Sequence, residues 1–299
     1  MAAEFKGKRA ASAEARKILR RQIDKGLSCL EGRRPSDERI HRAREQIKMA
    51  RATLRLLRAG LTDKQYRTEN RRLRDAARPL SAARDAAVLR KAFQHILPRR
   101  RGARLPQDAL ATDRMLAEEQ VLAQRRISGD QGIPHSRRLL RKARGHAARW
   151  HLDKEDWSTI GPGLRRVYRN GRKEFLAVRH APSDAGFHEW RKQVKYLCHQ
   201  IQLLRPVWPG PLDSLAGQLH TLSDYLGDDH DLVVLRSKLT AKISSRSDKS
   251  TRWPRFTRLD RERSELQRKA LERGIRIYEQ PPGLFCSRLR QYWRQWRRA

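Results

Sequence analysis

The 299-residue chain is poor in acidic side chains: 33 Asp and Glu stand against 69 Lys and Arg, which gives a formal net charge of +36. A charge of this size destabilises a compact protein by self-repulsion unless an anionic partner or counterions neutralise it. Hydrophobic residues still make up 38% of the chain and recur at regular spacing, which excludes a disordered basic tail. The composition therefore predicts a folded protein whose partner is anionic: nucleic acid, polyphosphate, phosphoinositide or an acidic membrane surface.

Cysteine and long apolar runs are also scarce. Cys29, Cys198 and Cys286 are widely spaced and fit neither a disulfide framework nor a zinc motif, which favours a reducing compartment. No stretch approaches the roughly 20 apolar residues of a membrane span, and the first residues lack the apolar segment of a signal peptide. We therefore expect a cytoplasmic protein without a membrane span, a metal or a cofactor.

The clearest pattern lies in Phe187–Arg205. Apolar residues recur there every three or four positions, as on the buried face of a helix. One residue after three of them come His188, Arg191 and Lys195. A shift of one residue turns about 100° around a helix, so the cations lie beside the buried stripe and not opposite it.

The same arrangement occurs earlier, since Ile40–Arg58 aligns with Phe187–Arg205 without a gap. Four basic positions match across the two segments: His41 with His188, Arg44 with Arg191, Lys48 with Lys195, and Arg58 with Arg205. Cys198 and Gln202 replace Arg51 and Arg55, so the second basic row is weaker in its middle. An internal repeat of this length predicts two similar halves.

Further cations share helix faces elsewhere. Arg74 belongs to a row in the long helical segment after Thr62, and Arg165, Arg169 and Arg172 share a face of Trp157–Arg179. No convincing series of strands is present, so the sequence predicts an all-α protein.

These residues resemble the CHAD family, the conserved histidine α-helical domain. The family signature is a His-x-x-Arg-x-x-x-Lys helix near the start of each half, followed by a leucine-rich helix with an Arg-Asp or similar pair. The first copy here carries His41-Arg44-Lys48 with Arg84-Asp85, the second His188-Arg191-Lys195 with His230-Asp231, and Tyr168 and Arg172 match the family's Tyr-x-x-x-Arg helix.

The resemblance covers roughly residues 10–297. It implies two antiparallel four-helix-bundle halves with a basic channel between them. We therefore expect one CHAD-like domain over residues 10–299, with the first repeat at about 10–180 and the second at about 181–299.

The resemblance also implies a function, the binding of inorganic polyphosphate in the channel, with some members residing at polyphosphate granules. Other members are fused to a triphosphate-tunnel catalytic domain, which carries a Glu-x-Glu-x-Lys strand near its start. The opening MAAEFKGKRA lacks that strand. The expectation is a stand-alone binding module and not an enzyme.

Rows of Arg and Lys at helical pitch suit a polymer with about one charge per phosphate, because Arg offers a bidentate fork to phosphate oxygens. Asp85 and Asp231 are expected to brace neighbouring cations. The predicted polyphosphate-binding residues are His41, Arg44, Lys48, Arg51, Arg55, Arg74, Arg165, Arg169, Arg172, His188, Arg191 and Lys195.

Two alternatives stay open at this point. Charge alone also suits a non-specific nucleic-acid-binding protein, although aromatics are only 6% of the chain and do not alternate with the basic rows as in single-strand-binding platforms. The run Asp228-Asp229-His230-Asp231 suggests a metal-dependent phosphohydrolase. The first copy, however, has Arg84 in the place of His230, and arginine does not ligate metals.

Overall fold

The computed structural model describes residues 4–7, 9–32, 35–97, 107–127, 129, 132–152, 156–244 and 255–298. Within these ranges all regular secondary structure is helical, which confirms the prediction of an all-α protein. The elements are α1 (Ala11–Cys29), α2 (Asp37–Leu56), the 3-10 helix η1 (Leu57–Gly60), α3 (Asp63–Ile96), α4 (Gln107–Ile127), α5 (Ile133–Ala148), α6 (Trp157–His180), α7 (Asp184–Leu204), the 3-10 helix η2 (Arg205–Val207), α8 (Pro209–Ser244), α9 (Arg255–Tyr278) and α10 (Pro282–Arg298).

Side-chain caps fix where the helices of the repeated segments begin. Ser36 accepts a hydrogen bond from the Arg39 backbone N–H at the start of α2, and Ser183 accepts one from Gly186 at the start of α7. Thr62 and Gln65 form a reciprocal capping box at the start of α3, which continues through Pro79. The caps fix these starting residues, and burial of the apolar stripe then decides where each basic row points.

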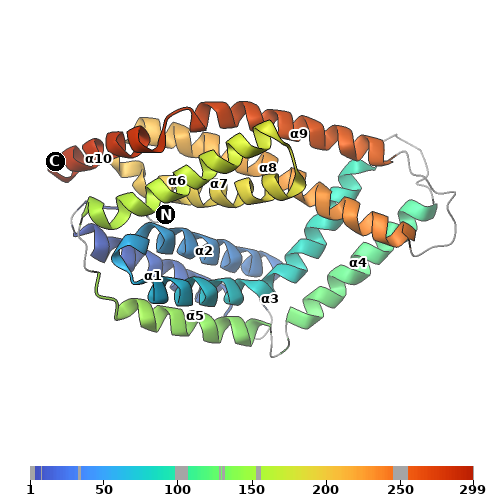
Figure 1. The fold of residues 1–299 in the computed structure, drawn as a ribbon. Coiled ribbons are helices and arrows are strands. Elements are labelled where there is room, and N and C mark those ends of the chain that lie inside the picture. Colours follow the sequence, from blue (N-terminus) through green and yellow to red (C-terminus); the bar gives the residue numbers. More distant parts are fainter. Residues whose placement is uncertain are drawn as a thin grey trace.

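The helices form two four-helix bundles, the first in the lower part of Figure 1 and the second in the upper part. In the first bundle, α1 and α3 each pack on both α2 and α5. In the second bundle, α7 and α9 each pack on both α6 and α8. By these contacts α6 lies with the second bundle, whereas the expected repeat boundary near residue 180 assigns it to the first. The internal repeat itself stays a prediction.

Two helices, α2 and α7, pack against each other across the junction between the bundles. The buried Gln200 of α7 donates a hydrogen bond to the Ala52 carbonyl of α2 at 3.1 Å. At the same end, a Cβ on Gly163 of α6 would come within 3.0 Å of the Arg55 and Leu56 carbonyl oxygens. Only glycine permits this approach, so α6 holds the end of α2 in place against the second bundle.

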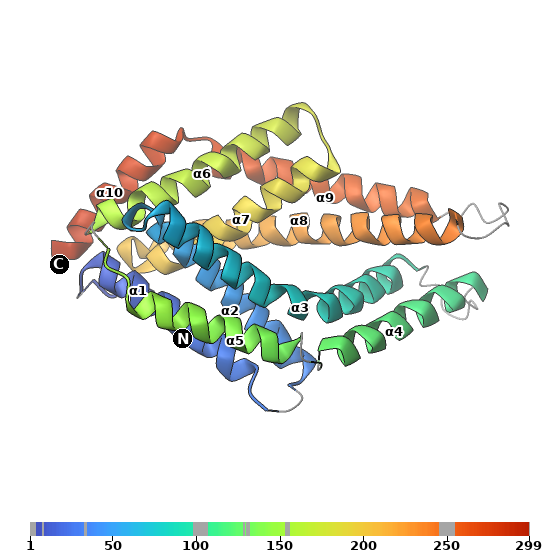
Figure 2. The same cartoon turned by 60° about the horizontal axis from the view of Figure 1, so that its bottom comes forward.

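The apolar interior consists of two clusters. The larger one contains residues of both bundles, among them Ile47, Leu54, Trp190 and Leu197. The smaller one joins the distal halves of α3 and α8 to α4 and α9, through residues such as Phe93 and Leu235. Figure 2 shows α3 and α8 extending beyond the bundles toward this second cluster. The two long helices therefore connect two separate cores.

Among the described residues, no helix combines the length and the apolar character that crossing a bilayer requires.

Candidate functional site

A cavity of about 680 Å³ lies between α2, α3, α7 and α8, bordered by the larger core at Tyr196 and by the smaller one at Leu89 and Val234. Among the described residues, eight Arg and Lys side chains line it against three carboxylates. The cations are Arg44, Lys48, Arg51, Arg55, Arg74, Arg191, Lys192 and Lys195, and the carboxylates are Asp85, Glu189 and Asp231. The cavity is therefore strongly electropositive.

The row on α2 lines the cavity because its residues recur every three or four positions on one helix face. Arg51 and Arg55, in the second half of this row, are held by contacts from α3 and α7. Asn70 of α3 accepts hydrogen bonds from Arg51 Nε at 3.3 Å and from Arg55 Nη1 at 3.1 Å. The Arg55 guanidinium also lies 3.8 Å from the centre of the Tyr196 ring on α7, a cation–π contact.

Arg44, in the first half of the α2 row, is anchored to α3. Its Nη1 donates to the Ser81 carbonyl at 3.2 Å, and its Nη2 lies 3.5 Å from an Asp85 oxygen. The side chain of Arg44 is only 12% exposed, whereas that of Asp85 is 62% exposed. Asp85 thus holds Arg44 from the solvent side, which is the bracing position expected for it.

The facing wall is formed by α7 and α8. His188 lies with its ring centre 4.5 Å from that of His230 on α8. Arg191 and Lys195 follow His188 on the same face and line the cavity. Arg191 Nε and His188 Nδ1 are buried and have no hydrogen-bond partner among the described residues. An unsatisfied buried polar group is costly. An anionic ligand in the cavity would supply an acceptor for Arg191 Nε, and for His188 Nδ1 when that nitrogen carries the proton.

Two lysines of the cavity, Lys48 and Lys195, are destabilised in their charged form. Burial, followed by repulsion from Arg191 and Lys48, lowers the pKa of Lys195 to about 7. Burial also lowers the pKa of Lys48, although Glu45 opposes this effect. The pKa of Glu45 would be raised by its own burial, but Lys48 overrides this and lowers it to about 2. Glu45 therefore remains a carboxylate and neutralises part of the α2 row.

The histidines of the cavity are uncharged in the free protein at neutral pH. Burial and the neighbouring Arg191 and His188 lower the pKa of His230 to about 4. Burial also lowers the pKa of His188 and of His199, and nearby lysines add to the effect in both cases. A polyanion in the cavity would reverse these shifts, because it favours the protonated forms.

The structure brings most of the predicted site residues together. Eight of them line the cavity: Arg44, Lys48, Arg51, Arg55, Arg74, His188, Arg191 and Lys195. His41 is half-buried near the start of α2 and is not among the lining residues.

The three arginines of α6 also lie away from the cavity lining. Arg172 donates from Nε to the Tyr278 carbonyl at 3.0 Å, Arg165 lies beside Gly283 at the start of α10, and Arg169 is exposed. They share a helix face as predicted. That face turns toward α9 and α10, because α6 packs on the outside of the second bundle.

Several lining residues were missed by the sequence-based selection, notably Lys192, Tyr196 and His199 of α7. Their spacing of three and four residues, in phase with Lys195, was a usable signal. His230 was noted in the family motif and in the metal alternative but was not selected as a polyphosphate-binding residue, and the side chain of its counterpart Arg84 lies outside the described part of the structure.

A metal-dependent phosphohydrolase would need several His, Cys, Asp or Glu side chains close enough to bind one metal ion. In the described ranges, no group of three or more His, Cys, Asp or Glu side chains is arranged to hold a metal ion. Within the run Asp228–Asp231, the buried Asp229 accepts hydrogen bonds from Arg263 Nε and Gln267 Nε2, both at 3.0 Å. This carboxylate therefore holds α9 against α8.

Fold and site together define an all-α protein with an electropositive cavity between two four-helix bundles. The family model of the CHAD domain matches residues 17–240, more than half of the chain, and the protein therefore belongs to the CHAD family. No curated protein sequence matches the chain.

Two solved structures share the fold. The crystal structure of the CHAD domain from the plant Ricinus communis is 15% identical, with a TM-score of 0.58, and the match covers 94% of this chain and 96% of that one. PptA from Streptomyces chartreusis is 14% identical, with a TM-score of 0.59, over 91% of this chain and 98% of that one. At these identities the similarity is one of fold.

Proposed function

We propose that the protein is a stand-alone module that binds inorganic polyphosphate in the cavity between its bundles. The observation that carries the proposal is the convergence of two cationic rows, from α2 and α7, on one cavity that contains few carboxylates. Membership of the CHAD family supports the same ligand, because the resemblance implies polyphosphate binding.

The chemistry of the cavity fits a linear phosphate polymer. Internal phosphates carry about one charge each and offer only oxygen acceptors, which match the donors of Arg and Lys. Arg191 Nε, which has no acceptor among the described residues, would gain one, as would His188 Nδ1 when that nitrogen carries the proton. The repulsion that lowers the pKa of Lys195 would be relieved at the same time.

Nucleic acid is the less suitable polyanion for this cavity. Tyr196 is the one Phe, Tyr or Trp among the described lining residues, and the Arg55 guanidinium already lies against its ring. A base would have to displace that guanidinium in order to stack on the ring. We therefore place nucleic acid as a non-specific competitor.

We propose a binding protein and not an enzyme, present in the cytoplasm and able to associate with polyphosphate granules, where its ligand is concentrated. The lining groups discussed above act as cations and hydrogen-bond donors, which is sufficient for binding.

A competition experiment tests the choice of ligand. Protein loaded with fluorescently labelled single-stranded DNA is titrated with polyphosphate that has the same number of phosphates, and the reverse titration is run beside it. We expect polyphosphate to displace DNA at far lower phosphate concentration than DNA displaces polyphosphate. Equal displacement in both directions would favour a general polyanion-binding protein.

Binding should also weaken steeply with salt. Each phosphate neutralised by an Arg or Lys releases condensed counterions, so the logarithm of the affinity should fall linearly with the logarithm of salt concentration. We expect a slope of several units, on the order of the number of cations engaged. Calorimetric titrations at four or more salt concentrations measure it. An affinity that is insensitive to salt would contradict binding through the cationic rows.

A further inference from the structure

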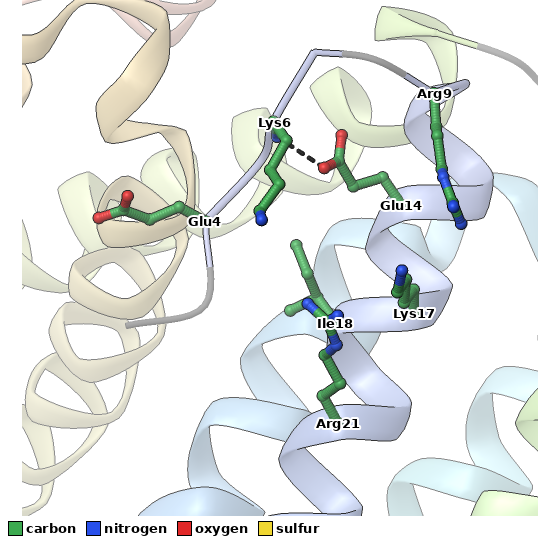
Figure 3. A pocket seen from close by; sticks show the side chains of 7 residues that line it. All are labelled: Glu4, Lys6, Arg9, Glu14, Lys17, Ile18 and Arg21. Carbon is green, nitrogen blue, oxygen red and sulfur yellow. Dashed lines mark hydrogen bonds between the residues drawn. The ribbon is translucent and has the colours of Figure 1, made fainter. Parts of the chain in front are cut away.

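A second basic hollow lies away from the cavity between the bundles. It has a volume of about 230 Å³ and is formed by the N-terminal segment and one face of α1. This is roughly the room of eight waters at about 30 Å³ each. Its lining residues are Glu4, Lys6, Arg9, Glu14, Lys17, Ile18 and Arg21 (Figure 3).

The walls of this pocket are fixed by contacts on both sides of Lys6. Phe5 is 1% exposed, and its backbone N–H donates to the Leu203 carbonyl at 3.1 Å. On the other side, Arg297 of α10 donates to the Arg9 carbonyl at 2.7 Å. The N-terminal segment is therefore held between α7 and α10, and the position of Lys6 and Arg9 over α1 is defined.

Four cations of the described residues surround the pocket. Figure 3 shows Lys6 and Arg9 on either side of Glu14, with Lys17 and Arg21 further along α1. Arg9 and Arg21 lower the pKa of the exposed Lys17, with smaller effects from desolvation and Lys6, and Glu14 opposes them. Because these cations repel one another, an anion bound between them would be stabilised.

The carboxylate at the head of the pocket is incompletely satisfied. Glu14 is 7% exposed, and its Oε1 accepts a hydrogen bond from the Lys6 backbone N–H at 2.6 Å. Its Oε2 is buried and has no hydrogen-bond partner in the part of the chain that the structure describes. A carboxylate oxygen is only an acceptor, so the pocket lacks a hydrogen-bond donor at this point. A simple anion would be repelled here, whereas an anion that carries a proton would supply the donor.

We propose that this pocket binds a tetrahedral oxyanion that retains a hydroxyl group, with inorganic phosphate as the simplest ligand. The charged oxygens of the ion would face Lys6, Arg9, Lys17 and Arg21, and its P–OH would donate to Glu14 Oε2. Sulfate has the same shape but no hydroxyl at neutral pH, so it would leave the carboxylate facing a second acceptor. Internal phosphates of a polymer also lack this hydroxyl. The inference thus concerns a site separate from the cavity and does not depend on polyphosphate binding there.

Calorimetric titration of the full chain with inorganic phosphate and with sulfate near neutral pH tests the proposal. To remove competing binding in the cavity, the protein carries Arg44→Ala and Arg191→Ala. We expect phosphate to bind at least about tenfold more tightly than sulfate, the factor expected for one charge-assisted hydrogen bond. Equal affinities for the two ions would overturn the proposal.

Two substitutions locate the binding. Lys17→Met should weaken phosphate binding about tenfold or more, whereas the matched control Lys173→Met, which removes an exposed charge from α6, should leave it unchanged. Glu14→Gln keeps an acceptor for the Lys6 N–H and places an NH₂ group toward the ligand, so it should reverse the preference in favour of sulfate. If Glu14→Gln does not fold, Lys17→Met still decides, because its side chain is exposed. Equal losses in Lys17→Met and Lys173→Met would overturn the proposal.

The source of the phosphate group is distinguished by two further probes. Linear triphosphate has terminal groups that can carry a hydroxyl, whereas cyclic trimetaphosphate has none. Binding of phosphate and linear triphosphate, but not of the cyclic compound, assigns the pocket to a chain end or the free ion. Binding of phosphate alone assigns it to the free ion. Binding of the cyclic compound as tightly as phosphate would overturn the role of the hydroxyl.

Discussion

Replacing Arg44 and Arg191 together by alanine should abolish most polyphosphate binding. Both side chains line the cavity and are largely buried, one on α2 and the other on α7. A charge-assisted hydrogen bond contributes about 1.5–3 kcal/mol, so two of them correspond to a loss of affinity between about a hundredfold and about ten-thousandfold if they add. Calorimetric titration with polyphosphate of defined length measures the change.

The matched control removes two charges from the surface. Arg141 on α5 and Arg166 on α6 are exposed, one in each bundle, and their double replacement by alanine changes the net charge equally. Screened surface charges contribute about 0–1 kcal/mol each, so the control should lose less than about thirtyfold. Circular dichroism must show that both variants keep their helical content. Equal losses in the two folded variants would mean that affinity follows net charge and not the cavity.

Polyphosphate affinity should fall as the pH rises above neutrality, because binding is coupled to protonation of Lys195. Burial, Arg191 and Lys48 lower its pKa from 10.5 to about 7 in the free protein, and a bound polyanion raises it again. Below pH 7 the lysine is charged with or without ligand, so it adds no pH dependence. Between pH 7 and the higher pKa of the complex, binding takes up a proton, and the affinity should fall by up to about tenfold per pH unit.

Proton uptake is measured directly by calorimetry in two buffers of different ionisation enthalpy. Long chains are used, so that terminal phosphates contribute little to the titration. Lys195→Met should remove this part of the slope and weaken binding below pH 7, whereas Lys195→Arg should remove the slope and retain the charge. Lys48, whose pKa is also lowered by burial, contributes a remaining slope of the same sign. Identical pH profiles for the wild type and both Lys195 variants would exclude Lys195 as the coupled group.

The parts of the site that could be predicted from the sequence are those that follow from the geometry of a single helix. The spacing of Arg44, Lys48 and Arg51 places them on one face, beside an apolar stripe that must be buried, so their arrangement on α2 was predictable. The start of α3 was also predictable, because Thr62 and Gln65 are a capping pair. The presence of the matching row in Phe187–Arg205 indicated that two such faces exist.

What a single helix does not determine is which neighbour its face meets. Arg172 shares a face with Arg165 and Arg169, yet it contacts Tyr278 and not the cavity, because the packing of α6 decides its direction. Tyr196 is apolar enough to be assigned to the core, and its contact with Arg55 places its ring at the cavity wall. The hollow around Glu14 was equally inaccessible, since it depends on Phe5 being anchored to Leu203, far away in the sequence.

The two apolar cores joined by α3 and α8 have a mechanical consequence. These helices contain 34 and 36 residues, so each follows an axis of about 50 Å, and α3 continues through Pro79. Both helices pack into the larger core on one side of the cavity and into the smaller core on the other. The two cores therefore hold α3 and α8 in place against the mutual repulsion of the cations in the free protein. Preorganisation of this kind lowers the entropic cost of binding, so we expect substitutions of Phe93 and Leu235, which do not line the cavity, to weaken polyphosphate binding.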